Sequence, residues 1–528
     1  MTTPLLIPSK YQTDIYDWVV NGTGAACVIG VAGCAKTTTI IDASKLVALG
    51  KSILMLAFNR RIANALQARV PANVDARTFN SLGHRILTGQ LGSLFVERWK
   101  VRDLCREYLS ELSESHCDNH RYPELCPSEQ IDGNLCGPRI SFFDVYQSFI
   151  CKIVALAKAM GIGALEPDDA ETWWALTESH DIEVESLDGS EEEGIALAQT
   201  ILGMSNKLAL TKHLIDFEDQ LYLPVLWGLS GKRYDWIFVD EAQDTNPVMR
   251  ALLKMALKPE GRLMAVGDPN QAIYAFAGAT NEAMDYIRED FSTIDLPLSI
   301  SYRCAKTIVK LAQTLVPEIE AWDQSPEGEV RRLDNRLATQ NAMLSLTPQD
   351  VILCRYNRPL VETAYYLIGE NIGCSIAGSE LGEGLISLIN RMKVPFNLDD
   401  LYEKISLYRD RQVEKNMQHG REEKAEAIKD KVEALFCIME HVENVPALKD
   451  EIFRLFAEKK GLLRLSTIHK AKGEEWSTVM IIRHHPWDNY RGKLGQEKNV
   501  RYVSYTRAKK LLILCSLDKE RVGSSDPI

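Results

Sequence analysis

The stretch GVAGCAKTTT, residues 30–39, carries residue types that bind phosphate. Gly30, Lys36 and Thr37 fit the P-loop pattern GxxxxGK[ST], in which backbone N–H groups cradle phosphates at a helix N-terminus. Ala35 stands where the pattern has its second glycine. If this alanine must be left-handed, it costs roughly 1–2 kcal/mol, which weakens nucleotide binding about tenfold without abolishing it. The predicted loop residues are Gly30, Val31, Ala32, Gly33, Cys34, Ala35, Lys36, Thr37 and Thr38.

A second stretch, DWIFVDEAQD at residues 235–244, ends an apolar run in two carboxylates. Asp240 and Glu241 are spaced so that one carboxylate can hold Mg²⁺ while the other lies beside an attacking water. The alternative is an acidic turn at the surface, which the preceding apolar run disfavours. Together with the loop, the stretch predicts an NTPase that uses ATP and Mg²⁺, with Thr37 and Asp240 as metal ligands.

These residues require strands that end beside one another. Apolar runs at 25–30, 52–58, 235–239 and 262–266 each lead directly into polar residues, and a second series lies at 350–354, 462–468, 477–482 and 511–515. Buried parallel strands have continuous Val/Ile/Leu runs, and α/β folds bind ligands at the carboxyl ends of the strands. We therefore expect two α/β domains with parallel sheets.

Two mostly helical stretches interrupt the strand series. The expected division is a first domain at 1–85 and 221–282 with an insertion at 86–220, and a second domain at 283–384 and 459–528 with a shorter insertion at 385–458. In the shorter insertion, apolar residues recur at helical spacing between 428 and 442. That helix packs on its own domain or binds a partner, and the first alternative is favoured.

The bulk composition is that of a globular protein. Of the 528 residues, 45% are hydrophobic and 25% are charged. The sequence has no apolar run of membrane-spanning length and no signal peptide at the start. We therefore expect a cytoplasmic protein without a membrane contact. A net charge of −12 argues against non-specific coating of nucleic acid but leaves room for a basic channel. Cys105, Cys117, Cys126 and Cys136 lie near His116 and His120 but lack CxxC spacing, so reduced thiols are favoured over a metal site.

The ordered motifs resemble those of superfamily 1 DNA helicases of the UvrD/Rep/PcrA type over nearly the whole chain. PSKYQTDIYDWV resembles the adenine-reading segment, and the phosphate-loop stretch GVAGCAKTTT resembles motif I. LAFNRRIANAL resembles motif Ia, ARTFNSLGHRIL resembles motif Ib, and VDEAQD resembles motif II. VGDPNQAIYAFAGA, LSISYRCAKTIV, LSTIHKAKGEEW and RYVSYTRAKKLLIL are similar to motifs III to VI. The resemblance implies two RecA-like P-loop domains, each carrying a mostly helical insertion.

The resemblance also implies a role for each matching residue. Catalytic residues would be Lys36, Asp240, Glu241, Gln271, Arg303 and Arg507, with the two arginines as fingers on the transferring phosphoryl group. Further nucleotide contacts would be Gln12 and Tyr302 at the adenine, Gln243 near the γ-phosphate and Glu475 at the ribose or phosphates. DNA contacts would be Phe58, Asn59, Thr78, Phe79, Tyr274, Phe276 and His469, although any of these aromatic residues could instead belong to the core.

Three departures from the family pattern bear on function. Ala277 replaces an arginine at the end of motif III, Asn80 stands where relatives carry histidine, and the second insertion is short. The resemblance implies an ATP-dependent helicase or translocase moving 3′ to 5′ on single-stranded DNA. Its substrates would be single-stranded and tailed duplex DNA, and a nuclease or a replication or recombination factor is a possible partner. The alternatives are a DNA-gated ATPase that senses ends or single strands and signals to a partner, and a degenerate nucleotide-binding scaffold.

Overall fold

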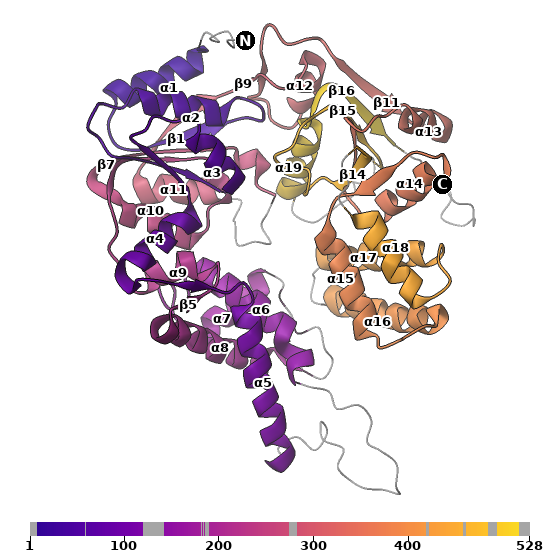
Figure 1. The fold of residues 1–528 in the computed structure, drawn as a ribbon. Helices are drawn as coiled ribbons and strands as arrows, with labels where there is room; N and C mark the ends of the chain where they lie inside the picture. The colour runs from indigo at the N-terminus through magenta and orange to yellow at the C-terminus, as the bar shows by residue number, and fades with distance from the viewer. Residues whose placement is uncertain are drawn as a thin grey trace, which may run out of the picture. The chain divides into compact units, whose positions relative to one another are not determined.

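The computed structural model describes residues 8–58, 60–119, 142–180, 182, 184, 189–273, 282–418, 422–457, 461–483 and 494–516. Contacts divide the chain into two compact units. Unit 1 comprises residues 1–29, 36–269 and 274–297, and unit 2 comprises residues 30–35, 270–273 and 298–528. The predicted α/β class is confirmed, because each unit contains a six-stranded sheet (Figure 1).

The sheet of unit 1 has the strand order β3-β2-β6-β7-β1-β8. Its strands are β1 (Ala26–Gly30), β2 (Ile53–Ala57), β3 (Val74–Thr78), β6 (Tyr234–Val239), β7 (Leu257–Gly267) and β8 (Ile294–Leu298). β7 lies between β1 and β6 and is parallel to both. The carboxyl ends of β1, β6 and β7 therefore lie at one edge, which is where α/β sheets bind ligands.

Helices of unit 1 connect these strands: α1 (Lys10–Asn21), α2 (Lys36–Lys45), α3 (Arg60–Gln67), α4 (Phe79–Leu91), α10 (Pro247–Ala256) and α11 (Ala283–Phe291). The predicted insertion forms α5 (Lys100–Asn119), α6 (Phe142–Met160), α7 (Ala170–Ser179), α8 (Glu191–Lys212) and α9 (Asp219–Leu226), with the paired short strands β4 (Phe95–Val96) and β5 (Leu214–Ile215). The insertion has its own core, centred on side chains such as Phe149, Ile153 and Trp173.

The sheet of unit 2 is wholly parallel, with the order β11-β16-β15-β12-β14-β13. Its strands are β11 (Glu329–Leu333), β12 (Val351–Cys354), β13 (Cys374–Ile376), β14 (Leu463–Thr467), β15 (Trp476–Ile481) and β16 (Ala508–Cys515). The short strands β9 (Ile300–Ser301) and β10 (Glu320–Ala321) pair separately. The helices are α12 (Lys306–Ala312), α13 (Arg336–Leu344), α14 (Arg358–Gly369), α15 (Ser379–Arg391), α16 (Leu398–Gln418), α17 (Glu422–Met439), α18 (Val445–Phe456) and α19 (Leu494–Tyr505).

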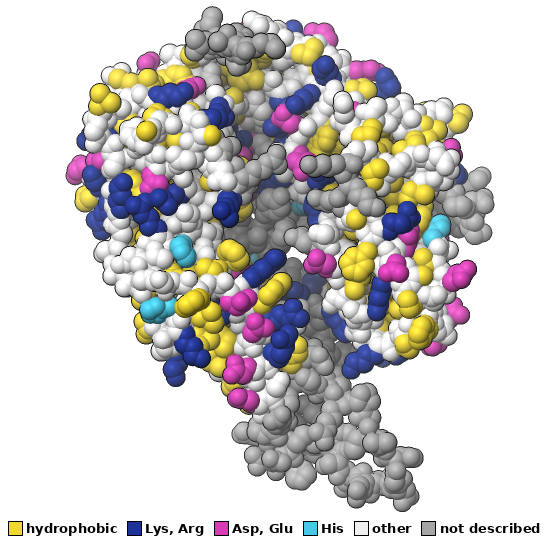
Figure 2. All heavy atoms as spheres, viewed as in Figure 1, with side chains coloured by type: hydrophobic (Ala, Val, Ile, Leu, Met, Phe, Trp, Pro, Cys, Tyr) yellow, Lys and Arg dark blue, Asp and Glu magenta, His cyan; other side chains and the backbone are white. Residues whose placement is uncertain are grey.

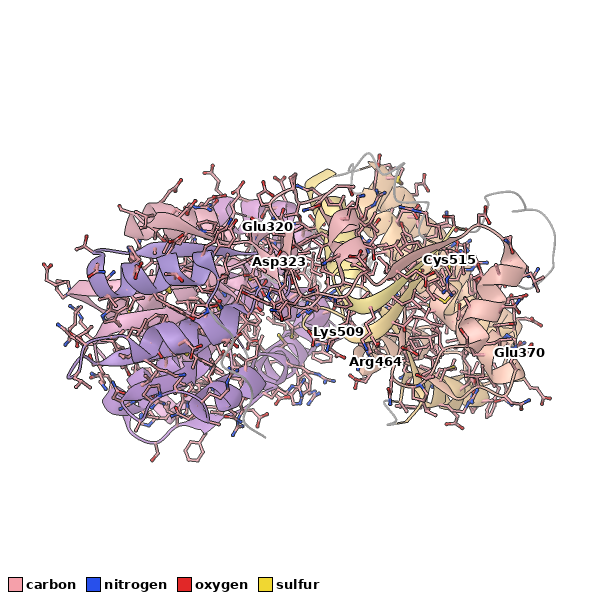
Figure 3. The ribbon with its side chains drawn as sticks, turned by 90° about the horizontal axis from the view of Figure 1, so that it is seen from above. Glu320, Asp323, Glu370, Arg464, Lys509 and Cys515 are labelled. Carbon is pink, nitrogen blue, oxygen red and sulfur yellow. The ribbon has the colours of Figure 1, made fainter. Side chains whose placement is uncertain are left out.

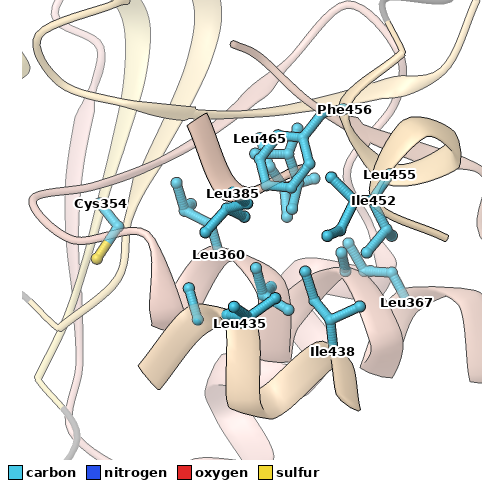
Figure 4. Packing of buried hydrophobic residues seen from close by; sticks show 14 of the residues in the cluster. Cys354, Leu360, Leu367, Leu385, Leu435, Ile438, Ile452, Leu455, Phe456 and Leu465 are labelled. Atoms are coloured by element: carbon cyan, nitrogen blue, oxygen red, sulfur yellow. The ribbon is translucent and has the colours of Figure 1, made fainter. Parts of the chain in front are cut away.

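The short second insertion shares a core with the sheet of unit 2. Leu435 and Ile438 of α17 and Ile452 of α18 pack in one cluster with Leu360 of α14 and Leu465 of β14 (Figure 4). This packing agrees with the favoured alternative for the 428–442 helix, namely that it packs on its own domain. The described residues of α15 to α18 therefore continue this core, whereas the first insertion has a separate core.

The first compact unit extends beyond the boundary expected for the first domain. We expected the first domain to end at residue 282, but α11 and β8 belong to unit 1, which extends to Pro297. β8 is the edge strand of the first sheet, next to β1. Its sequence, IDLPL, contains a charged residue, Asp295, and a proline, Pro297, which is typical of an edge strand and gives no continuous apolar run.

A buried ionic network anchors the first insertion. Lys100 of α5 lies 2.6 Å from Asp219 of α9, and Lys158 of α6 lies 2.5 Å from Asp216 and 2.7 Å from Asp219. All four side chains are at most 3% exposed. Burial alone would raise the pKa of Asp219, but the charges of Lys158 and Lys100 outweigh burial and lower it. The carboxylate is therefore ionised and holds two helices to the start of α9.

Replacing Asp219 with asparagine should destabilise unit 1 by about 3–5 kcal/mol, because two buried ammonium groups then face a neutral amide. Urea unfolding followed by circular dichroism measures this change. The matched control is Asp103→Asn, which removes an exposed carboxylate 3.5 Å from Arg106 and should cost under about 1 kcal/mol. Equal stability of the two variants would contradict the anchoring role of Asp219.

Candidate nucleotide site

The phosphate-loop sequence forms a tight turn between β1 and α2. Gly33 has φ 74° and Ala35 has φ 64°, so both residues are in the left-handed region. Glycine adopts this conformation without steric cost, whereas alanine incurs a penalty of about 1–2 kcal/mol. The structure thus places Ala35 in the strained position that the sequence left open. Lys36 and Thr37 follow as the first residues of α2.

The carboxylates after β6 lie against the start of α2. The Thr37 hydroxyl donates a hydrogen bond to Asp240 Oδ2 at 2.6 Å, and the backbone N–H of Glu241 donates to Asp240 Oδ1 at 3.0 Å. Asp240 is 1% exposed, and burial raises its pKa to about 6, with the charge of Glu241 acting in the same direction. A half-buried hydroxyl and a buried carboxylate in contact are oxygen ligands of the kind that Mg²⁺ prefers, so these two residues fit the predicted metal.

Gln243 connects the second carboxylate to the end of β7. Its amide Nε2 donates to Glu241 Oε2 at 2.7 Å, while its Oε1 accepts from the backbone N–H of Asp268 at 3.0 Å. A Cβ at Gly267 would come within 2.6 Å of Gln243 Oε1, so the glycine makes room for this amide. Glu241 itself has φ 53°, a strained backbone of the kind found at functional sites.

Gln12 lies in the same unit but has a role that its motif did not predict. Its side chain accepts from the backbone N–H of Ser9 at 3.0 Å and donates to Thr39 Oγ1 at 3.1 Å. With the Ser9 hydroxyl it forms a capping box at the start of α1, a pattern visible in the spacing of Ser9 and Gln12. The side chain of Thr38 accepts from Arg69 at 3.2 Å.

A second group of predicted residues gathers in unit 2 around Arg303. Its Nε donates to Glu475 Oε2 at 2.5 Å, and Lys509, labelled in Figure 3 on β16, pairs with Glu475 Oε1 at 2.6 Å. Burial alone would raise the pKa of Glu475, but the hydrogen bond from Lys509 and the charge of Arg303 outweigh it and lower the pKa. Tyr302 precedes this arginine, with its ring 5.7 Å from the ring of Trp322.

Arg507 is the other predicted finger, and it is 1% exposed. Its guanidinium donates to Gln271 Oε1 at 3.1 Å, to the carbonyl of Glu474 at 3.1 Å and to the carbonyl of Val503 at 3.0 Å. These contacts fix its orientation in the core of unit 2 and bring together the residues predicted from motifs III and VI. A guanidinium oriented by several hydrogen bonds is a planar donor group suited to recognising a phosphate.

The phosphate loop also makes contacts within unit 2. The N–H of Ala32 donates to the Tyr502 hydroxyl at 2.8 Å, and the N–H of Tyr302 donates to the carbonyl of Gly33 at 2.9 Å. A Cβ at Gly33 would lie 2.6 Å from Cβ of Arg303, so this glycine is required for the close approach as well as for its φ. The loop therefore lies directly against the backbone of Tyr302 and Arg303.

The predicted DNA contacts are only partly described. Asn59, Tyr274 and Phe276 lie outside the described residues, as does Ala277. Phe58 is 41% exposed after β2, and Thr78 accepts from the N–H of Ser81 as the N-cap of α4. Phe79 corrects an expectation: it is buried in the core of unit 1, because it begins α4 on the face that packs against the sheet. Its ring offers no surface for stacking.

His469 lies half-buried after β14. Burial lowers its pKa to about 3, with help from the charges of Arg355 and Lys472, so the imidazole is neutral at pH 7. Motif matching also missed Phe217, an exposed ring beside the Ib-like stretch whose carbonyl accepts from Asn80 at 2.8 Å.

The cysteine cluster is mostly outside the described residues. Cys126 and Cys136 fall in the segment 120–141, and the side chain of Cys117 is likewise not described. Cys105 is buried in α5, hydrogen-bonded to the thiol of Cys151 on α6. Within the described residues, no group of three or more His, Cys, Asp or Glu side chains is placed to bind a metal ion, and no helix is long and apolar enough to cross a membrane.

Two RecA-like parallel sheets, with a phosphate loop after the first strand and a carboxylate pair after β6, define an α/β protein of the P-loop class. Family models narrow this class further. The UvrD/REP helicase N-terminal domain matches residues 13–292, and the UvrD-like helicase C-terminal domain matches residues 390–519. The chain belongs to the UvrD/Rep helicase family.

Curated relatives agree with this assignment. The chain is 26% identical to the F-box DNA helicase 1 of Gallus gallus over 92% of this chain and 47% of the relative. It is 32% identical to a probable DNA helicase II homolog of Mycoplasma pneumoniae over 59% of this chain and 42% of the relative. A shorter match, 31% identical over 20% of this chain and 17% of the relative, is to the ATP-dependent DNA helicase Rep of Escherichia coli. The chain thus spans about half or less of the length of these relatives.

Replacing Ala35 with glycine should keep ATP hydrolysis and leave the dissociation constant for ATP unchanged or up to about tenfold lower, because glycine removes the left-handed penalty. Replacing Lys36 with alanine should eliminate hydrolysis, since the loop loses its charge on the phosphates. Calorimetric ATP titration and steady-state hydrolysis measure both changes. Loss of hydrolysis in Ala35→Gly would contradict this view of the loop.

Proposed function

We propose that the protein is an ATP-dependent DNA helicase and translocase that moves 3′ to 5′ on single-stranded DNA. The observation that carries the proposal is the contact of Thr37 with Asp240, beside the Glu241–Gln243 pair at the sheet edge. This arrangement supplies a metal-binding pair and a carboxylate base next to a phosphate loop, which is what hydrolysis of a nucleoside triphosphate requires.

In this proposal Lys36 and the loop N–H groups hold the phosphates, and Thr37 and Asp240 hold Mg²⁺. The metal ion would neutralise charge on the phosphate oxygens. Glu241 accepts a proton from the attacking water, and Gln243 keeps its carboxylate oriented. Gln271 would report the γ-phosphate, and Gln12 and Tyr302 would contact the adenine.

Arg303 and Arg507 complete the proposed site. Each would place a planar cation on the transferring phosphoryl group, and Glu475 would position Arg303 as well as contact the ribose. ATP would bind more tightly to the domain arrangement in which all these residues reach it than to other arrangements. Hydrolysis removes this preference, so the favoured domain arrangement changes. A single strand bound to both domains could then be moved with each cycle, contacted by Phe58, Asn59, Thr78, Tyr274, Phe276 and His469.

Strand displacement on 3′-tailed, 5′-tailed and blunt duplexes tests the proposal. We expect unwinding of the 3′-tailed substrate with ATP and Mg²⁺, and none of the 5′-tailed or blunt duplex. Unwinding from a 5′ tail alone would overturn the direction, and unwinding without ATP would overturn the mechanism.

A second candidate function is a DNA-gated ATPase that senses single strands or ends and signals to a partner such as a nuclease. The shared core of α15, α17 and α18 with the sheet favours it, because the second insertion then offers less separate surface for engaging a duplex. Strong stimulation of ATP hydrolysis by single-stranded DNA without displacement of any tailed strand would support this candidate over the helicase.

A further inference from the structure

We infer that the first insertion carries an additional contact for single-stranded DNA, formed by Phe95, Arg98, Trp99 and Arg102, which we call the aromatic–arginine patch. The inference rests on the proposed function, since it extends the path of the strand beyond the motif residues. Phe95 is 67% exposed and Trp99 is 50% exposed. Large aromatic rings exposed to this degree, four residues apart in the chain, are typical of a surface that binds a ligand.

The patch stands on rigid structure. Phe95 N–H donates to the carbonyl of His213 at 2.9 Å, and Glu97 N–H donates to the carbonyl of Ile215 at 2.8 Å, which fixes β4 beside β5. Directly after Trp99 comes Lys100, whose ammonium is locked in the buried ionic network. The backbone on both sides of the Trp99 ring is therefore held in place, and a preformed platform loses little entropy on binding.

Two arginines flank the Trp99 ring. The guanidinium carbon of Arg98 lies 4.8 Å and that of Arg102 5.6 Å from the ring centroid. Both side chains are exposed, and within the described part of the chain neither is within ion-pair distance of a carboxylate. Guanidinium groups beside an exposed indole offer a phosphate contact and a stacking surface within one nucleotide of each other.

The nearby carboxylates have other partners. Glu97 Oε1 accepts from the N–H of Trp99 at 3.2 Å at the start of α5, and Asp103 pairs with Arg106 at 3.5 Å. Figure 2 shows hydrophobic, basic and acidic side chains intermingled over the face of this insertion that is in view. The chain carries a net charge of −12, so the positive charge at this patch is local, as expected for a contact with a polyanion at a defined place.

Single-stranded rather than duplex DNA fits the patch because stacking on Phe95 or Trp99 needs a base with an open face. Base pairs inside a duplex stack on one another and leave only edges accessible. Aromatic and arginine residues are also common at protein interfaces, so a protein partner is the outcome that the test must separate.

The test is fluorescence anisotropy of a fluorescein-labelled oligo-dT probe with the full chain. Trp99→Ala should weaken binding about 5- to 100-fold, and Trp99→Phe should retain most of the affinity, because a stacked base depends on the aromatic face. The matched control is Trp174→Ala, which removes another partly exposed tryptophan of the same insertion, on α7, and should leave affinity unchanged. Replacing both Arg98 and Arg102 with alanine should reduce the slope of log affinity against log salt by about 1.4.

The outcomes separate the inference from the proposed function. If the wild-type chain binds oligo-dT and Trp99→Ala binds it equally well, the patch is not a DNA contact and the inference is overturned. If the wild-type chain does not bind oligo-dT at all, the result contradicts the proposed function, on which the inference rests. Equal weakening in Trp99→Ala and Trp174→Ala would show a general structural effect and would also overturn the inference.

Discussion

Replacing Arg303 with alanine is expected to lower kcat for ATP hydrolysis by about 10³–10⁵-fold, the range found for arginine fingers. The guanidinium is half-buried and is held by Glu475 and by the carbonyl of Thr506 at 3.2 Å, so its position is fixed before it meets a phosphate. Arg303→Lys should restore little of this activity, because a lysine cannot reproduce the planar fork. Single-turnover hydrolysis at saturating ATP measures the loss.

A purely structural role for Arg303 makes a different prediction. Breaking a partly exposed ion pair costs at most about 1 kcal/mol of stability. Glu475→Gln removes the same ion pair while keeping the arginine, so it should lower kcat far less than Arg303→Ala does. If the two variants lose activity equally, with similar losses in melting temperature, Arg303 acts through its salt bridge and not on the phosphate.

Replacing Glu241 with glutamine is expected to lower kcat by about 10²–10⁴-fold while ATP binding persists, because an amide cannot take a proton from water. The glutamine oxygen can still accept the hydrogen bond from Gln243, so the local geometry should survive. ATP affinity from calorimetry and kcat from a phosphate-release assay separate binding from chemistry.

Glu260→Gln is the matched control for this variant, since Glu260 is an exposed carboxylate of unit 1 on β7. It should leave both ATP affinity and kcat unchanged. Hydrolysis by Glu241→Gln at the wild-type rate would remove Glu241 from the proposed mechanism, and Asp240 would then be the remaining carboxylate to test.

The sequence predicted the fold where apolar runs lead into reactive residues. The runs before Gly30 and Asp240 are strands, and the carboxyl ends of β1, β6 and β7 meet because parallel pairing fixes their order. The edge strand β8 was missed because it is mostly exposed and has an unpaired hydrogen-bonding edge, so it contains Asp295 and Pro297 instead of a continuous apolar run. A continuous apolar run signals a central strand and cannot reveal an edge strand.

Within the site, the contact of Thr37 with Asp240 follows from the motifs, but three features do not. The left-handed Ala35 required coordinates, because the sequence allowed either a strained or a relaxed loop. Phe79 was misread because the motif places an aromatic there without stating which face of α4 it occupies. The hydrogen bond of Gln12 to Thr39 also required coordinates, although the spacing of Gln12 from Ser9 already indicates a capping box.

The aromatic–arginine patch could not be predicted from the sequence for a similar reason. Phe95 and Trp99 lie outside the motifs, and exposure depends on the pairing of β4 with β5 and on the anchoring of Lys100, contacts that join residues more than 100 positions apart. Local sequence patterns report periodicity and spacing, whereas exposure of a ring is decided by such distant contacts.

The most direct test of the proposed function is the rate of ATP hydrolysis as single-stranded DNA is titrated into the full chain at saturating ATP and Mg²⁺. We predict a hyperbolic rise in rate with DNA concentration for the wild type, and a rate about 10²–10⁴-fold lower at every DNA concentration for Glu241→Gln. A wild-type rate that stays constant over the whole titration would contradict coupling of the nucleotide site to DNA.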